Sequence, residues 1–306
     1  MHPDHDHDHD HDHDLGLGLG LGLAHDLNRL QQQALERRRA LRWLLGAGAA
    51  SLGGAGAMAL AGCGGGGTEA GASTASTASG SSGSSGTTTG SGCSVIPSET
   101  EGPYPGDGSN SVNGSIANAL ALSGIARSDI RASIAGATGV ATGVPLQVII
   151  ELVNTSASCA DLAGYAIYLW HCDALGRYSM YSGGVTAENY LRGVQPTGSD
   201  GTAVFTTIYP GCYAGRVPHI HFEVYRSATT ATNWNNKLRT SQLCFPPEAS
   251  SAVYAGSGYG QSAANNSAIS LASDGIFSDG YSTQMVTLTG SVSAGYVARL
   301  QVGISA

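Results

Sequence analysis

The chain has 306 residues, of which 42% are hydrophobic and 12% are charged, and it contains 45 glycines. This composition predicts one globular domain together with a substantial non-globular part. The formal net charge is −8. Because nucleic-acid binding depends on clustered lysines and arginines that neutralise phosphates, this charge argues against a nucleic-acid partner.

Residues 1–63 have the layout of an export signal behind a low-complexity extension. A basic region within Arg37–Arg42 precedes an uncharged, weakly apolar stretch, Trp43–Gly62, and its adjacent arginines resemble a twin-arginine signal. The sequence LAGC, Leu60–Cys63, resembles a bacterial lipobox. We therefore predict an exported protein, in the periplasm or at the cell surface, that contacts a membrane only through a lipid at Cys63. A retained transmembrane anchor is the alternative, since the uncharged stretch is long enough to cross a bilayer.

Two further segments before the folded domain have low complexity. The His-Asp repeat near the N-terminus alternates too regularly for a folded metal site and lies upstream of the predicted cleavage point. We interpret it as a solvated tail or as the product of an early start codon. Residues 64–92 are mostly Gly, Ser and Thr, a composition typical of a flexible linker. The folded domain is therefore predicted over residues 93–306.

This domain is predicted to be all-β, an antiparallel β-sandwich with long loops. Its β-branched and aromatic runs are separated by turn sequences such as DALG, TGSDG and SAG, and helical periodicity is almost absent. The predicted strands are Pro145–Asn154, Tyr165–Cys172, Tyr190–Gln195, Thr202–Tyr209, His219–Tyr225, Gln284–Val292 and Tyr296–Ile304. The segment Ser109–Ala135 is compatible with either a short helix or a loop.

The cysteines of the predicted domain are consistent with export. They are Cys93, Cys159, Cys172, Cys212 and Cys244, which allows two disulfides and one odd thiol. The sequence alone does not fix which of them pair. Zinc binding is disfavoured because no CxxC pair is present.

The sequence HIHFEVY, His219–Tyr225, places two histidines one residue apart in a predicted strand. Side chains alternate along a strand, so the two histidines share one face with the glutamate and tyrosine that follow, and the three apolar residues share the other. The two imidazoles then converge, as two ligands of one metal ion do. A purely structural histidine pair is the other interpretation, because His171 is the only further histidine after Cys63.

Four longer stretches give this pair a context: SETEGPYPGDGS (Ser98–Ser109), YLWHCDALGRYSMYS (Tyr168–Ser182), Asn189–Val224 and TSQLCF (Thr240–Phe245). Their ordered motifs GRY, PGxY, GR and HIHF resemble the intradiol ring-cleavage dioxygenases, in particular the protocatechuate 3,4-dioxygenase β-chain-like group. The resemblance covers about half of the chain, and the tail from residue 246 matches only loosely.

The resemblance implies a mononuclear non-haem Fe(III) ion held by Tyr178, Tyr213, His219 and His221. This ligand set also makes chemical sense, because anionic phenolate oxygen stabilises the hard Fe(III) ion over Fe(II). The implied reaction inserts both atoms of O₂ between the two hydroxyl-bearing carbons of a catechol and gives a muconate-type diacid.

Three residues have further implied roles in this reaction. Tyr213 is implied to leave the iron and take a substrate proton, Arg216 to stabilise charge that develops on the substrate, and Gln242 to lie near the substrate. Tyr213 occupies a glycine-flanked turn in which a phenolate can move, whereas Tyr178 is expected at the start of a strand. We also predict a Cys172–Cys212 disulfide that ties together the two tyrosine loops.

Two departures from the family leave the substrate and the oligomeric state open. Only Ala214–Pro218 separate the second tyrosine from the histidine pair, which is shorter than in the classical enzymes, and the helical dimerisation region of the catechol 1,2-dioxygenase group has no counterpart. The competing function is a non-catalytic exported β-sandwich, a ligand-binding or adhesion module with a structural metal or none.

Overall fold

The computed structural model describes residues 93–306. The predicted export signal and lipobox in residues 1–63 and the predicted linker in residues 64–92 lie outside this part of the chain. Within residues 93–306, the helices are all too short or too polar to cross a membrane. The description below therefore concerns the predicted β-sandwich domain.

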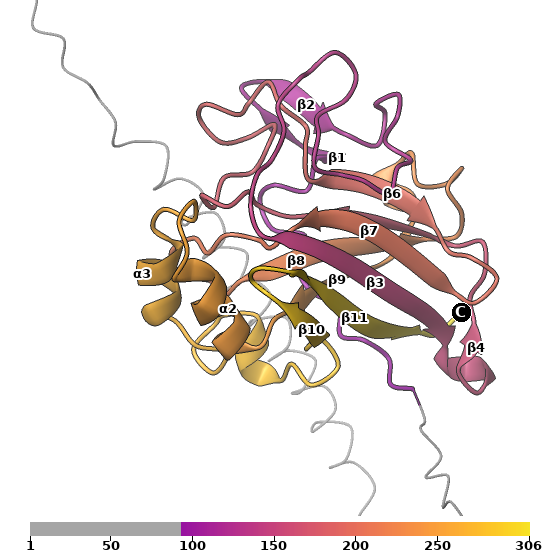
Figure 1. The fold of residues 1–306 in the computed structure, drawn as a ribbon. Coiled ribbons are helices and arrows are strands. Elements are labelled where there is room, and N and C mark those ends of the chain that lie inside the picture. The colour runs from indigo at the N-terminus through magenta and orange to yellow at the C-terminus, as the bar shows by residue number, and fades with distance from the viewer. Residues whose placement is uncertain (1–92) are drawn as a thin grey trace, which may run out of the picture. The chain divides into compact units, whose positions relative to one another are not determined.

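Two β-sheets packed face to face form this domain, as Figure 1 shows. The first sheet has the strand order β10-β11-β3-β7, and the short strand β4 also pairs with β3. Its strands are β3 (Pro145–Asn154), β4 (Ala160–Asp161), β7 (Thr202–Ile208), β10 (Thr287–Ser291) and β11 (Gly295–Ile304).

The second sheet has the strand order β6-β5-β8-β9, and all its pairs are antiparallel. Its strands are β5 (Ala166–Trp170), β6 (Arg192–Pro196), β8 (His219–Tyr225) and β9 (Lys237–Cys244). Because β8 lies between β5 and β9, both of its edges are hydrogen-bonded and its backbone is held firmly.

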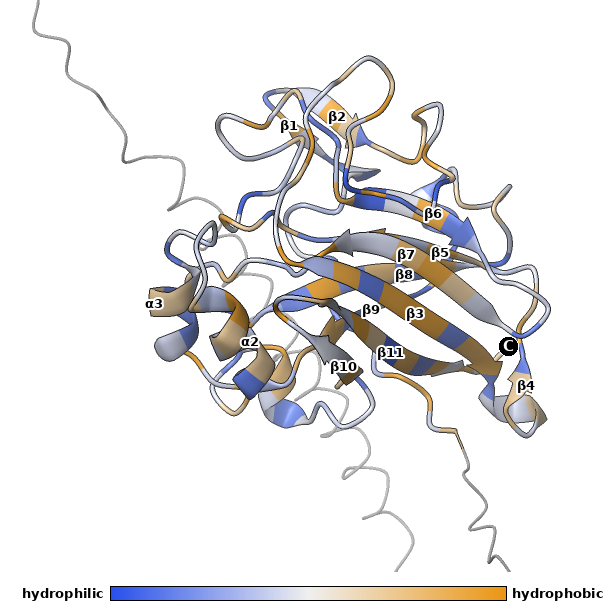
Figure 2. Cartoon of the chain, viewed as in Figure 1, coloured by the Kyte–Doolittle hydropathy of each residue, from blue (hydrophilic) through white to orange (hydrophobic). Residues whose placement is uncertain are grey.

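The hydrophobic core fills the space between the sheets. Ile220 and Phe222 of β8 contribute to the same buried cluster as Val148 and Ile150 of β3 and Phe205 of β7. Figure 2 shows this as hydrophobic residues along β3, interrupted by hydrophilic ones. The alternation leaves the other face of β8, which carries the histidines, for a different environment.

A β-hairpin and two short helices complete the domain. The hairpin consists of β1 (Asp107–Val112) and β2 (Ser115–Asn118), joined by Asn113 and Gly114 with φ of 49° and 79°. Positive φ at both turn positions is the requirement of a type I′ turn, which asparagine and glycine meet at low energy. The helices are α2 (Pro247–Tyr254) and α3 (Ser262–Ser267), and 3₁₀ turns lie at Thr155–Ala157, Trp234–Asn236 and Phe277–Asp279.

All seven predicted strands are present, two of them with the predicted bounds, and the β-sandwich is confirmed. One pairing differs from the antiparallel expectation, because β11 runs parallel to β3 from Tyr296↔Leu146 to Ile304↔Asn154. The segment from Ser109 to Ala135 begins with the hairpin and continues as turns and isolated bridges, so it contains no helix. Strand β9 was not expected, because its buried half contains the polar sequence TSQ and does not form an apolar run.

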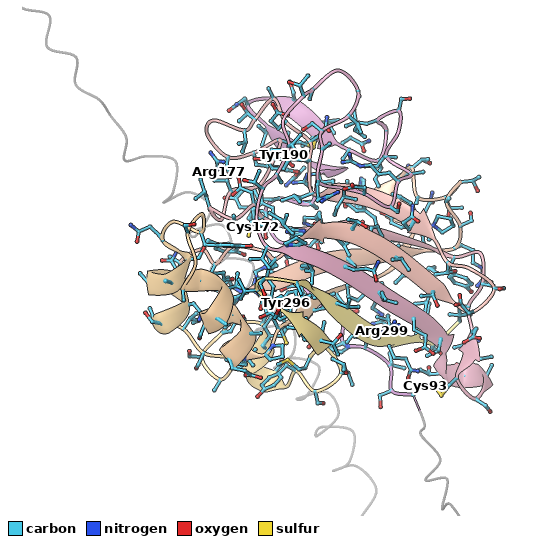
Figure 3. All side chains as sticks on the ribbon, in the orientation of Figure 1. Cys93, Cys172, Arg177, Tyr190, Tyr296 and Arg299 are labelled. Carbon is cyan, nitrogen blue, oxygen red and sulfur yellow. A yellow bond between two sulfur atoms is a disulfide. The ribbon has the colours of Figure 1, made fainter. Side chains whose placement is uncertain are left out.

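The predicted Cys172–Cys212 disulfide is wrong. The bond forms instead between Cys93 and Cys159, whose Cα atoms are 5.7 Å apart, while Cys172, Cys212 and Cys244 are free, buried thiols. In Figure 3 the labelled Cys93 lies beside β4, far from Cys172 in the middle of the domain. The disulfide therefore fastens the start of the domain to the turn after β3, and the tyrosine loops are held together in another way.

Candidate metal centre

Backbone contacts join the two loops that carry the tyrosines. The Gly211 N–H donates a hydrogen bond to the Asp173 carbonyl over 3.1 Å, and the Cys172 thiol donates to the Gly211 carbonyl over 3.4 Å. A Cβ atom at Gly211 would lie 2.5 Å from the Asp173 oxygen and 2.8 Å from the Gly176 nitrogen. Only glycine fits such an approach, so the PGCY sequence brings Tyr213 against the other loop without a disulfide.

The two histidines of β8 direct their Nε2 atoms toward one point. His219 and His221 are 2% and 3% exposed, and their Nε2 atoms lie 3.1 Å apart. The Nδ1 atom of His219 lies 2.6 Å from the Val217 carbonyl, which fixes it as the protonated donor. The lone pair of His219 Nε2 therefore faces the space shared with His221 and with the Tyr213 hydroxyl, 3.2 Å away.

A neighbouring aromatic ring fixes the orientation of His221. Trp170 of β5 is paired with His221 across the two strands, and their rings stack with centroids 5.0 Å apart and planes 7° apart. Tyr168 stacks in turn on Trp170 at 5.0 Å. The site therefore rests on a packed aromatic ladder, and the His221 ring has little freedom to rotate.

Tyr178 reaches the same space from the loop between β5 and β6. The expected position at the start of a strand is wrong, because the Tyr178 carbonyl accepts hydrogen bonds from the N–H groups of Tyr181 and Ser182 and so forms a turn. The ring is 2% exposed, and its centroid lies 6.0 Å from that of Tyr213 and 6.3 Å from that of His221. Its buried hydroxyl makes no hydrogen bond of normal geometry within residues 93–306.

Burial shifts the pKa values of three of these four side chains, His219, His221 and Tyr178. It lowers the pKa values of His219 and His221 well below the usual range, so both imidazoles are neutral, the form that ligates metals. Burial and the adjacent Tyr213 raise the pKa of Tyr178 well above that of an exposed tyrosine. A phenolate at this place therefore requires a nearby cation that compensates for the lost hydration.

The four side chains fit the Fe(III) ion that the sequence predicts. Metal–imidazole bonds of about 2.0–2.1 Å accommodate nitrogens at the observed separation. The Tyr178 hydroxyl is buried and makes no hydrogen bond of normal geometry in the described domain, so a metal ion would satisfy it. Two phenol oxygens and two imidazole nitrogens form a hard, potentially anionic donor set, which suits Fe(III). Within residues 93–306, no group of three or more His, Cys, Asp or Glu side chains is arranged so that it could hold a metal ion.

Arg216 and Gln242, the other two predicted site residues, lie beside this cluster. Gln242 is completely buried on β9, opposite His221, and its Oε1 accepts a hydrogen bond from Arg216 Nη2 over 2.7 Å. Gln242 Nε2 donates to the Thr100 carbonyl over 2.9 Å. Burial works against the charge of Arg216, but Tyr213 and Asp274 outweigh it and raise its pKa. The structure therefore brings all six predicted residues together around one buried positive charge.

Sequence reasoning missed two residues that support the centre. Trp170 was assigned only to a strand, although its position opposite His221 follows from the register of β5 and β8. Asp274 binds Arg216 from a turn far along the chain, and no sequence signal pointed to it. The third histidine, His171, does not belong to this group. Its Nε2 atom lies 2.7 Å from Oγ1 of Thr207, which is on β7 in the first sheet.

Solved structures with the same fold were found by structural comparison. An intradiol ring-cleavage dioxygenase from Tetranychus urticae is 25% identical, with a TM-score of 0.53 over 69% of this chain and 95% of that chain. A second dioxygenase crystal structure is 24% identical, with a TM-score of 0.53 over 69% and 94% of the two chains. No protein-family model and no curated protein sequence matches the chain. The described domain thus has the β-sandwich fold of these dioxygenases.

Proposed function

We propose that this protein is an Fe(III)-dependent intradiol dioxygenase, which cleaves the ring of a catechol-type substrate with O₂ and gives a muconate-type diacid. The observation that carries the proposal is the convergence of the Tyr213 hydroxyl and the Nε2 atoms of His219 and His221 beside the buried hydroxyl of Tyr178. The likeness to the Tetranychus urticae protein, which is itself an intradiol ring-cleavage dioxygenase, supports it.

In this proposal the four iron ligands have different roles. His219 and His221 are neutral donors whose rings are fixed by the Val217 carbonyl and by Trp170. Tyr178 is the firmly held anionic donor, because its ring is buried. A bound Fe(III) ion would supply Lewis-acid chemistry toward the catechol at this place.

Tyr213 is the residue to which we assign proton transfer. It lies at the edge of the site, half-buried, in a turn closed by Gly215 with a φ of 85°. A side chain on such a turn moves without disturbing a strand. The Tyr213 Oη atom is therefore placed to accept a proton from a catechol hydroxyl, which no carboxylate in the cluster does.

Arg216 and Gln242 supply the electrostatic part of the mechanism. The buried guanidinium lies close enough to Tyr213 and Tyr178 for both to raise its pKa. Negative charge that develops on the bound substrate is stabilised by this fixed cation, which needs no reorganisation during the reaction. Gln242 holds the guanidinium plane through Nη2 and links it to the Thr100 carbonyl.

We further propose that the protein acts outside the cytoplasm, attached to a membrane by a lipid at Cys63. This follows from the basic region, the uncharged stretch and the LAGC sequence. Metabolic labelling with a fatty acid in a bacterial host tests it: Cys63→Ser should abolish the labelling. Labelling that persists in this variant would contradict the assignment.

Oxygen uptake by the purified, iron-loaded protein with a panel of catechols tests the enzymatic proposal. We expect uptake that depends on iron content, a ring-opened diacid as product, and a reddish visible absorption from tyrosinate-to-Fe(III) charge transfer. A colourless protein that binds no iron would contradict the metal centre and favour the ligand-binding module. A coloured protein that consumes no oxygen with any catechol would contradict the enzymatic function alone.

A further inference from the structure

We infer that Asp274 is a positioning residue that holds the Arg216 guanidinium toward the metal centre. This inference rests on the proposed function and adds a residue to it. Asp274 lies in the C-terminal segment between α3 and β10, where the sequence matches the dioxygenase family only loosely. It is completely buried, and its carboxylate forms an ion pair with Arg216 Nε at 3.0 Å.

The contacts of Arg216 show how the pairing sets its orientation. Nε donates to both carboxylate oxygens of Asp274, over 3.0 and 3.2 Å, and Nη2 donates to Gln242 Oε1 over 2.7 Å. The Phe277 ring, also completely buried, lies 5.8 Å from the guanidinium carbon. Two adjacent edges of the planar guanidinium are thus fixed, at a place close enough to Tyr213 and Tyr178 for both to raise its pKa.

The carboxylate of Asp274 is itself held by the backbone. Oδ1 accepts hydrogen bonds from the N–H groups of Ile276 and Phe277, over 2.8 and 3.2 Å, and Oδ2 accepts from the Val217 N–H over 2.8 Å. An acceptor with this many donors keeps one orientation, so the ion pair is rigid. The backbone of this turn therefore fixes Asp274, and Asp274 in turn fixes Arg216.

Val217 connects the same carboxylate to the metal ligands. Its N–H binds Asp274, and its carbonyl accepts the hydrogen bond from His219 Nδ1. The peptide group before Val217 thus binds Asp274, and the peptide group after it binds the His219 ring. The arrangement joins the position of Arg216 to that of His219, which is the kind of supporting contact that metal sites require.

The first experiment compares Asp274→Asn with the unmodified protein. We expect kcat with a catechol to fall about 100-fold, because a small misplacement of a catalytic group has this effect, while KM and iron content stay near the wild-type values. The matched control is Asp129→Asn, which removes a half-exposed carboxylate that is paired with Arg131 and should leave kcat unchanged. An Asp274→Asn protein with the kcat of the wild type would overturn the inference.

A double-variant cycle with Arg216→Met separates positioning from general destabilisation. If Asp274 acts through Arg216, the double variant Arg216→Met with Asp274→Asn should have the same kcat as Arg216→Met alone. A further large loss of kcat in the double variant would show that Asp274 acts independently of Arg216, and would overturn the inference.

Thermal unfolding of the same proteins tests the Asp274–Arg216 ion pair without a measurement of activity. Arg216→Met leaves a buried carboxylate without its cation, so the double variant should melt higher than this single variant, by roughly 5 °C or more. An equal or lower melting temperature would overturn the pairing. If the wild type consumes no oxygen, the proposed function fails, and this cycle still shows whether Asp274 and Arg216 are coupled.

Discussion

The buried polar groups in the two halves of one face of β8 have different kinds of partner. In the second half, Tyr225 Oη donates a hydrogen bond to Glu223 Oε2 over 2.6 Å, and Lys237 Nζ donates to Oε1 over 2.9 Å. In the first half, His219 and His221 bring nitrogen atoms together at 3.1 Å, beside phenol groups.

This difference shows how a binding centre is distinguished from a structural network. The Glu223 carboxylate is satisfied by groups of the protein itself, as buried polar groups normally are. The histidine half instead brings two ring nitrogens together, and the Tyr178 hydroxyl beside them makes no hydrogen bond of normal geometry in the described domain. The Fe(III) ion that we propose for this site would stabilise such an arrangement.

Removing a histidine is the strongest way to test this contrast. We expect His219→Ala and His221→Ala to abolish iron loading and catechol-dependent oxygen uptake, because each deletes a ligand. The fold should survive, since Ile220 and Phe222 on the other face of β8 belong to the core. Metal analysis and circular dichroism would check both statements, with Lys237→Met as the control that keeps its iron. Normal iron content in both histidine variants would rule out the assigned site.

The two tyrosines sharpen the contrast within the centre. Tyr213→Phe should retain part of its Fe(III) but lose about 10²- to 10⁴-fold in turnover, because the proton acceptor is gone. Tyr178→Phe should lose most of its iron and the visible charge-transfer band, because the firmly held anionic ligand is missing. Iron analysis, visible spectra and oxygen uptake distinguish the two variants. Equal iron loss in both would mean that the tyrosines have the same role.

His171, which is not one of the four proposed ligands, offers a test by pH. Burial lowers its pKa to about 4 from the usual 6.5. Between these two values the unfolded chain binds the proton more readily than the folded one, so the free energy of unfolding falls as the pH drops, by at most about 3 kcal/mol. His171→Gln should flatten this dependence in denaturant titrations at pH 7 and pH 4.5. An unchanged slope would mean that His171 is protonated in the folded protein.

The smallest expected effect concerns the half of this β8 face in which Glu223 is hydrogen-bonded by Tyr225 and Lys237. Burial raises the pKa of Glu223 to about 7, and Lys237 opposes this rise. Lys237→Met should lower the free energy of unfolding at pH 8 by about 2 kcal/mol, because the buried carboxylate loses its charged partner. Glu223→Gln combined with Lys237→Met should recover part of the loss. Denaturant titration measures both, and a lower iron content in Lys237→Met would contradict the separation of the two halves.

The sequence predicted the regular parts of this structure because side-chain alternation determines which strand residues face each other. The convergence of His219 and His221 followed from their spacing of two within one strand, and the family motifs added Tyr178, Tyr213, Arg216 and Gln242. All six lie together in the structure.

What the sequence did not predict depends on contacts between distant segments. Asp274 reaches Arg216 only because the segment after α3 folds back onto the sheet, and local patterns carry no information on such a return. The Cys172–Cys212 prediction failed for a similar reason. Gly211 packs so closely against the other loop that backbone hydrogen bonds already hold the two loops together. Cys93 reaches Cys159 because the Ile96 N–H donates a hydrogen bond to the Gly303 carbonyl of β11, which brings the start of the domain to that end of the sandwich.

The parallel pairing of β3 with β11 affects how the chain reaches its fold. β3 is made early and is rich in β-branched residues, but one of its edges is covered only by β11, the final strand of the domain. During synthesis this edge stays open while everything from β4 to β10 emerges from the ribosome, and an open apolar edge invites pairing with other chains. Completion of the sandwich must therefore wait until β11 has been made, and loss of this ten-residue strand would leave an edge of β3 exposed rather than merely shorten the protein.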